Sequence, residues 1–120
     1  MKKVLILGPE LIIMQMIAIN LKLLFGKEVT FFTQKYILGT EGVINLLIVF
    51  ASEIINGSID LELVKKGYGN PDMKVVIVSA FDEYLEEVKK TTSADLYLSS
   101  FVLVAEDIDP ATEKELLALI

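Results

Sequence analysis

Five short apolar runs, separated by segments of different character, constrain the fold of this chain more than any other feature of its sequence. The runs are rich in aliphatic, β-branched or aromatic side chains, and the third is the most apolar of them. A short continuous apolar run is typical of a parallel strand that is buried on both faces of a sheet. The five runs cover residues 3–8, 28–33, 46–51, 74–79 and 94–99. We therefore expect five strands, with the third at the centre of the sheet.

Segments that favour helix lie between or after these runs. Gly26 directly follows the first segment and Gly67 the third, and each glycine is placed as a C-terminal cap. Asp109 followed by Pro110 has the chemistry of an N-cap and a first helical position. The second segment contains two glycines, which weaken a helix. The five predicted helices cover residues 10–25, 36–44, 59–66, 82–90 and 110–120.

The alternation of strands and helices decides the fold class. The segments between strands have the length of crossovers between parallel neighbours, so the sequence predicts an α/β protein with a doubly wound (βα)5 parallel sheet. We expect the flavodoxin-like strand order 2-1-3-4-5. The chain has 120 residues, 53% of them hydrophobic, which fits a single domain over residues 1–120. Ligands of such sheets bind beyond the carboxyl ends of the strands, between strands one and three, so functional residues are expected there.

The composition removes several classes of function. All 11 basic residues are lysines, and 17 acidic residues give a net charge of −6. Without arginine, and with this negative charge, no nucleic-acid partner is expected. The chain has no Cys and no His, which excludes disulfides, zinc sites of the Cys/His type and imidazole bases. Much ordinary enzyme chemistry is therefore excluded, and carboxylates, hydroxyls and lysines remain.

The first 25 residues have the order of charges and apolar residues found in a secretory leader, because a pair of basic residues precedes an apolar stretch that ends at Phe25. Gly8-Pro9-Glu10 interrupts this stretch, further polar residues interrupt it again, and no A-x-A-like cleavage site follows. No apolar span of about 20 residues remains for a transmembrane helix. We expect no leader, no membrane association and a location in the cytoplasm.

Local motifs, in the predicted order of elements, resemble one known family. Residues 75–81 read Val-Val-Ile-Val-Ser-Ala-Phe, which resembles the fourth strand of CheY-like receiver domains of response regulators, with Ser79 at the switch Ser/Thr position. Residues 60–63, Asp-Leu-Glu-Leu, are similar to the opening of the third receiver helix, and residues 39–43 are similar to part of the second. The resemblance covers essentially the whole chain and implies the same fold and a role in two-component signalling.

The chain departs from the receiver family at the positions that carry phosphoryl transfer. Receivers have two acids after strand one, an aspartate acceptor after strand three and a lysine after strand five. Here Gly8 and Pro9 stand at the acidic pair, and Ser99 stands at the lysine. Ser52 aligns with the acceptor, within a gap that leaves positions 50–53 open, and none of those four residues is Asp. Of these functional positions, the switch hydroxyl alone is kept.

These departures have a direct chemical consequence. Mg²⁺ takes oxygen ligands, usually with one or two carboxylates, and Gly8 and Pro9 offer backbone carbonyls alone. An acceptor without a metal ion and without a cation has nothing to neutralise the charge that develops during phosphoryl transfer. We therefore expect a pseudo-receiver that has the fold without the phosphorylation site, and that holds no metal and no cofactor.

Three alternatives use the same strand ends. In the first, Ser52, Ser79 and Ser99 line a crevice, and the chain is a small flavodoxin-like ligand-binding domain or enzyme. In the second, Glu10 and Glu53 are displaced metal ligands, or Glu53 mimics a phosphorylated aspartate. In the third, Ser52 is itself phosphorylated. A hydrolytic serine lacks support because the chain has no histidine to act as its base.

The predicted helix over residues 10–25 has more apolar residues than one buried face requires. One row, with spacings of 4, 4 and 3, is placed to face the sheet and consists of Ile13, Ile17, Leu21 and Leu24. A second row points outward and consists of Ile12, Met16, Ile19 and Leu23. An exposed apolar helix face marks an interface with another protein, and a homodimer is the simplest case. The alternative is that the last helix and nearby loops bury the second row.

A second candidate surface combines helix 82–90 with strand 94–99 and the last helix, through which receivers commonly dimerise or meet their outputs. Tyr84, Leu96 and Tyr97 are its candidate contact residues. The switch aromatic position of receivers aligns with Leu96, and Tyr97 lies one residue further along. We expect a regulatory domain without enzyme activity that acts on a protein partner in trans and forms a homodimer.

Overall fold

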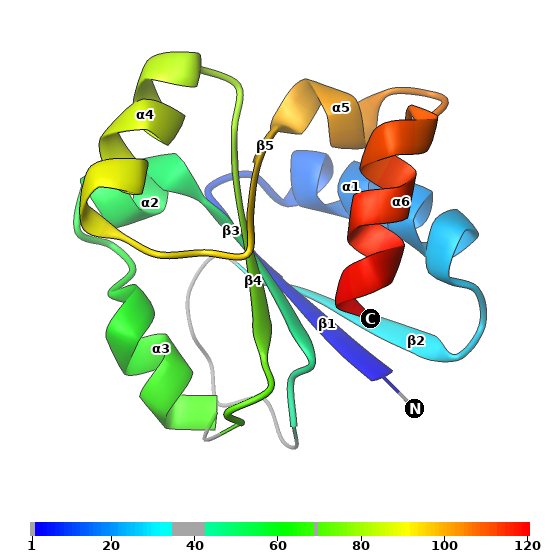
Figure 1. The fold of residues 1–120 in the computed structure, drawn as a ribbon, viewed down its shortest axis with the longest axis horizontal. Helices are drawn as coiled ribbons and strands as arrows, with labels where there is room; N and C mark the ends of the chain where they lie inside the picture. The colour runs from blue at the N-terminus through cyan, green and yellow to red at the C-terminus, as the bar shows by residue number, and fades with distance from the viewer. Residues whose placement is uncertain (1, 35–42, 69) are drawn as a thin grey trace.

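The computed structural model describes residues 2–34, 43–68 and 70–120, and a five-stranded sheet lies at its centre (Figure 1). All neighbouring strands pair in parallel, in the order β2-β1-β3-β4-β5. The strands are β1 (Lys2–Leu7), β2 (Val29–Gln34), β3 (Leu46–Phe50), β4 (Lys74–Ser79) and β5 (Leu96–Ser99). This is a flavodoxin-like α/β fold, which confirms the predicted fold class and strand order.

Helices cover both faces of the sheet, and Figure 1 shows the two groups on either side of the strands. One group consists of α1 (Leu11–Phe25), α5 (Ser100–Val104) and α6 (Pro110–Leu119). The other group consists of α2 (Ala51–Ile55), α3 (Leu61–Tyr68) and α4 (Asp82–Thr91). The helix after β1 and the helix after β3 therefore lie on opposite faces, which is the geometry of a topological switch point.

Alternate residues of the central strands supply the two halves of the core. In β1, Leu5 and Leu7 belong to the cluster beneath α2, α3 and α4, whereas Val4 and Ile6 belong to the cluster beneath α1, α5 and α6. All four side chains are fully buried. A strand that is buried on both faces needs apolar residues at successive positions, which explains the continuous apolar run in this part of the sequence.

Two of the predicted helix ends are confirmed. Gly26 follows α1 with a φ of 82°, a conformation that costs glycine little, and its N–H donates to the carbonyl oxygen of Lys22 over 2.9 Å. Asp109 is the N-cap of α6, and its carboxylate accepts hydrogen bonds from the backbone N–H of Thr112 at 2.9 Å and from the Thr112 hydroxyl at 2.8 Å. Pro110 is the first residue of α6.

The structure contains two short helices that the sequence does not predict. α2 begins at Ala51, directly after β3, and α5 begins at Ser100, directly after β5. The third predicted strand is therefore one residue too long, and the fifth strand begins at Leu96 rather than at residue 94. Each helix has five residues, which is too short for a repeating apolar pattern to show in the sequence.

The prediction that Gly67 caps the third helix is wrong. Gly67 lies inside α3, which continues to Tyr68, and it does not have the positive φ of such a cap. The predicted helix over residues 36–44 falls outside the described residues, apart from Val43 and Ile44, which belong to no helix.

α1 is the longest helix that the structure describes, with 15 residues. Its Asn20 side chain ties it to α5, because Nδ2 of Asn20 donates to the carbonyl oxygen of Leu103 at 2.7 Å and to that of Ala105 at 3.0 Å. Within residues 2–34, 43–68 and 70–120, no helix combines the length and the apolar character that a membrane crossing requires.

Candidate functional site

A pocket of about 260 Å³ lies at the carboxyl edge of the sheet, where the chain leaves β1, β3, β4 and β5. It is at the switch point at which a ligand site was expected. Its apolar lining consists of Pro9, Ile13, Phe50, Ala80, Phe81, Tyr84, Phe101 and Val104. Its polar lining consists of Glu10, Ser52, Ser79 and Ser100. The pocket is therefore an apolar cavity that contains a few hydroxyl groups.

Gly8, which the sequence analysis aligned with the first acid of receivers, packs against an aromatic ring. Gly8 is buried directly after β1, and a Cβ built on it would lie 2.5 Å from Cδ1 and 2.9 Å from Cε1 of Phe50. A side chain at position 8 would therefore collide with this ring. Pro9, which the sequence analysis aligned with the second acid, is exposed and lines the pocket.

The expected convergence of three serines holds for two of them. Ser52, in the first turn of α2, and Ser79, the last residue of β4, line the same pocket. Ser99 does not line it, because its side chain is the N-cap of α5 and accepts a hydrogen bond from Phe101 N at 3.3 Å. Ser100 takes that place instead, since the turn into α5 brings this next residue to the pocket.

The serines differ in how their hydroxyl groups are engaged. Ser79 is 4% exposed, and its Oγ accepts a hydrogen bond from Phe81 N at 3.0 Å. Ser100 is 6% exposed and, within the described residues, its hydroxyl has no hydrogen-bond partner. Within the described residues, every side-chain oxygen that is sealed from solvent has a hydrogen-bond partner. Because Oγ of Ser100 has no partner there, it is not sealed from solvent, and it faces the open space of the pocket.

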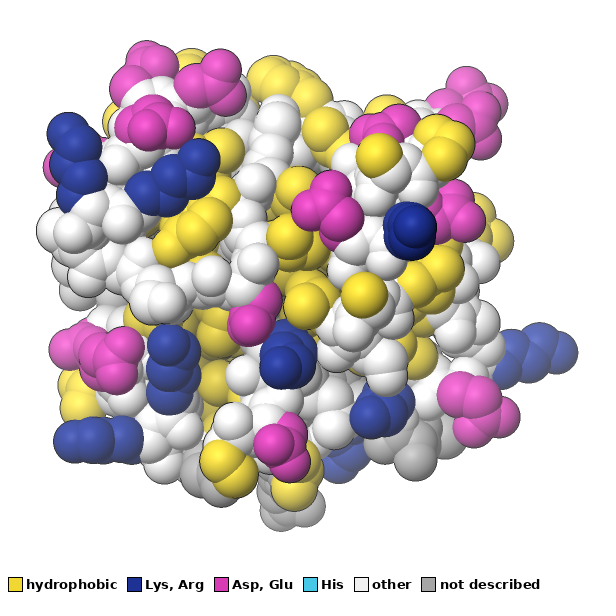
Figure 2. Space-filling model, in the orientation of Figure 1, with side chains coloured by type: hydrophobic (Ala, Val, Ile, Leu, Met, Phe, Trp, Pro, Cys, Tyr) yellow, Lys and Arg dark blue, Asp and Glu magenta, His cyan; other side chains and the backbone are white. Residues whose placement is uncertain are grey.

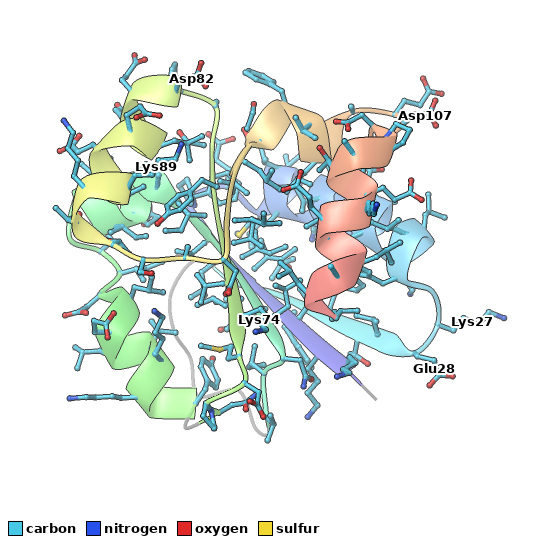
Figure 3. The ribbon with its side chains drawn as sticks, in the orientation of Figure 1. Lys27, Glu28, Lys74, Asp82, Lys89 and Asp107 are labelled. Atoms are coloured by element: carbon cyan, nitrogen blue, oxygen red, sulfur yellow. The ribbon has the colours of Figure 1, made fainter. Side chains whose placement is uncertain are left out.

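Charged groups around the pocket are few. Glu10 lines its rim, and no lysine lines it among the described residues. Figure 3 labels Lys27 and Lys74, which lie near the amino-terminal ends of β2 and β4, at the opposite edge of the sheet. Figure 2 shows acidic side chains gathered over α4, which begins next to the carboxyl edge of the sheet. An anion in the pocket would have no described cation to pair with.

Of the two acids that the sequence analysis weighed as metal ligands, one lines the pocket and the other does not. Glu10 precedes α1 at the rim of the pocket, whereas Glu53 lies in α2 and is absent from the pocket lining. Residues 2–34, 43–68 and 70–120 contain no group of three or more acidic side chains placed to hold a metal ion together.

The outward row of α1 is exposed, as the spacing predicts. The exposed fractions of its side chains are 72% for Ile12, 42% for Met16, 62% for Ile19 and 81% for Leu23. The alternative in which neighbouring elements bury this row is wrong for the described residues. In the inward row, Ile17 and Leu21 are fully buried, whereas Ile13 and Leu24 are partly buried, and Met14 is fully buried as well.

The second candidate surface has anchored rather than free aromatic side chains. Tyr97 is partly buried against the core cluster beneath α2, α3 and α4, and its hydroxyl donates to the carbonyl oxygen of Thr92 and accepts from Ala94 N. The Lys89 ammonium lies 5.5 Å from the centre of the Tyr97 ring. Leu96 points to the other face of the sheet and packs in the core cluster of α1, α5 and α6.

Tyr84 is the third candidate on this surface, and it belongs to the pocket instead. Its ring packs edge to face on Phe81, with the ring centres 5.3 Å apart, and both residues line the pocket. The sequence analysis did not assign the aromatic residues Phe50, Phe81 and Phe101 to this site. The signal that could have found them is their position, since each lies at or just after the end of a strand.

Comparison with known proteins adds no family to this description. No protein-family model matches the chain, and no curated protein matches its sequence.

Proposed function

We propose that this chain is a receiver-like regulatory domain that acts through contacts with another protein and does not depend on aspartyl phosphorylation. The observation that carries the proposal is the outward row of α1, defined by Ile12, Met16, Ile19 and Leu23, which is exposed along the length of the helix. The first partner that this row fits is a second copy of the chain, and a further partner then binds in trans. We place the domain in the cytoplasm.

The carboxyl edge supports independence from phosphorylation. The Phe50 ring lies against Gly8, so the space that an acidic side chain would need at this position is taken. A phosphoryl acceptor needs a metal ion and a cation to neutralise developing charge, and no lysine lines the pocket among the described residues. Regulation by the amount of partner, rather than by a covalent modification of aspartate, is consistent with such a site.

The charge of α1 supports a symmetric dimer. The chain carries a net charge of −6, yet residues 11–25 contain no acid and a single lysine. Two copies that meet through this helix would bury apolar side chains without bringing their acidic surfaces together. A two-fold axis matches one self-complementary patch to itself, which is the commonest way in which homodimers form. Because methionine is flexible, Met16 can adapt to the facing helix.

Light scattering coupled to size exclusion tests the proposal. We expect the wild-type chain to elute as a dimer and the double variant Ile12→Glu with Met16→Glu to elute as a folded monomer. Leu63→Glu is the matched control, because Leu63 is 64% exposed on α3, on the opposite face of the sheet, and should leave the dimer intact. Addition of Mg²⁺ with beryllofluoride, which imitates a phosphorylated aspartate, should change nothing.

Three results would contradict the proposal. A wild-type monomer at all concentrations would remove the homodimer, and a dimer that survives the double substitution would move the interface away from α1. A change of oligomeric state with beryllofluoride would mean that the chain still switches through phosphorylation.

A further inference from the structure

We infer that the carboxyl-edge pocket binds a small, uncharged organic molecule with one aromatic ring and a hydrogen-bonding group such as a hydroxyl. This goes beyond the proposed protein contact, and it does not depend on dimerisation. It rests on three properties of the pocket, namely its size and aromatic walls, the hydroxyl of Ser100 that has no protein partner among the described residues, and the absence of a described cation from its lining.

The walls suit an aromatic occupant. Phe50, Phe81, Tyr84 and Phe101 line the pocket, and the Phe81 and Tyr84 rings already pack edge to face. Aromatic rings prefer offset or edge-to-face neighbours whose ring centres lie about 4.5–7 Å away, and a ligand ring in the pocket can take such a position. The volume of about 260 Å³ exceeds the roughly 150 Å³ of an apolar cavity that holds benzene, so a one-ring compound with a short polar substituent fits.

The base of the pocket supplies the hydrogen bonds. Ser100 is more than nine-tenths buried, and its Oγ meets the open space of the pocket without a protein partner in the described part of the chain. A ligand group or a water can form the hydrogen bond that this hydroxyl lacks within the described part of the protein. Ser79 adds a second hydroxyl, whose oxygen accepts from Phe81 N while its hydrogen remains available to donate.

Charge sets the class of ligand. The Glu10 carboxylate at the rim repels an anion, the chain has a net charge of −6, and no lysine lines the pocket among the described residues. Burial of an unpaired anion is expensive, so phosphates and carboxylates are disfavoured. The buried base offers hydroxyl groups and no carboxylate, so a neutral hydroxyl satisfies it without the desolvation of a charge.

The test uses three probes of similar shape, namely benzyl alcohol, benzoate and benzylamine, followed through the backbone amide signals of Phe81 and Tyr84 in ¹H–¹⁵N spectra. We expect benzyl alcohol to shift these signals with a dissociation constant on the order of 1 mM, the strength of a one-ring ligand. Benzoate and benzylamine should each bind at least fivefold more weakly. No binding of benzyl alcohol, or tighter binding of either charged probe, would overturn the inference.

Variants locate the binding. Phe101→Ala removes a wall residue that is 65% exposed, so the fold should survive, and it should weaken benzyl alcohol binding at least fivefold. Leu63→Ala is the control, because Leu63 has a similar exposure and lies on α3, outside the pocket. Ser100→Ala should weaken binding about threefold to tenfold, the size of one hydrogen bond. Unchanged binding in Phe101→Ala would refute the site even if Ser100→Ala did not fold.

Discussion

The ring of Phe50 lies so close to Gly8 that a Cβ on Gly8 would be 2.5 Å from Cδ1 of the ring. Phe50 ends β3 and Gly8 follows β1, so the two residues join neighbouring strands at the carboxyl edge. Glycine is required at position 8 by this close approach and not by backbone conformation, because Gly8 does not have a positive φ.

Gly8→Ala should destabilise the protein by about 1–3 kcal/mol, because the added methyl group overpacks the site against the Phe50 ring. Urea unfolding measures the change. Gly67→Ala is the control, since a Cβ on Gly67 meets no heavy atom within 4 Å and the residue lies inside α3. The control should raise stability by up to about 1 kcal/mol through helix propensity. Equal stability of Gly8→Ala and wild type would mean that the ring moves aside freely.

Met14 and Met16 should respond oppositely to truncation, although two positions separate them in α1. Met14 is fully buried, so Met14→Ala should cost about 2–5 kcal/mol through lost burial and a cavity. Met16 is 42% exposed, so Met16→Ala should stay within about 0.5 kcal/mol when unfolding is measured at a concentration where the chain is monomeric. A large loss in Met16→Ala under these conditions would place the outward row of α1 in the core.

Tyr97→Phe should cost about 1–2 kcal/mol, because the Tyr97 hydroxyl bridges the Thr92 carbonyl and the Ala94 N–H. Urea unfolding of Tyr97→Phe and of a matched control, Tyr84→Phe, tests this. In Tyr84→Phe the change should stay within about 0.5 kcal/mol, since the Tyr84 hydroxyl has no hydrogen-bond partner within the described residues. A neutral Tyr97→Phe would mean that these two hydrogen bonds add nothing to the stability of the fold.

Asp109→Ala should lower the thermal midpoint of unfolding at pH 7, and the difference from wild type should shrink in acid. The backbone N–H of Thr112, and then its hydroxyl, hold the pKa of Asp109 below its usual value of 3.8. Because the folded pKa is the lower one, this stabilisation is complete above pH 3.8 and is lost as the pH falls through the folded value. Thermal unfolding followed by circular dichroism at pH 7 and in acid measures both effects.

Asp107→Ala is the control for this substitution. Asp107 is exposed two residues before the cap, and Figure 3 shows its position at the start of the segment that leads into α6. The Asp107→Ala variant should have the same thermal midpoint of unfolding as the wild type at neutral pH. A difference for Asp109→Ala that persisted unchanged in strong acid would show that charge at the cap contributes nothing.

The sheet was predictable because its central strands are buried on both faces, which leaves a continuous apolar run in the sequence. β4 matches the predicted bounds of residues 74–79 without change. The C-terminal end of α1 and the start of α6 were predictable because Gly26 and Asp109 satisfy backbone groups that helix ends leave open. These signals are local, so a single sequence carries them.

The short helices α2 and α5 were not predictable, since five residues make little more than one helical turn. Tertiary packing holds them, through the buried side chains of Ala51 and Leu103. The residues of the pocket were not fully predictable for a related reason. Which of Ser99 and Ser100 reaches the pocket depends on the residue at which β5 turns into α5, and sequence patterns do not resolve a strand end to one residue.

The two hydrogen bonds from Asn20 make the opening of α5 depend on α1. A five-residue helix has little stability of its own, and its last carbonyl groups have no partner within the helix. Nδ2 of Asn20 occupies the carbonyl oxygens of Leu103 and Ala105 and so fastens this end to the longest described helix. The amide protons of α5 should therefore exchange with solvent as slowly as those of the middle of α1, as members of one cooperatively unfolding unit.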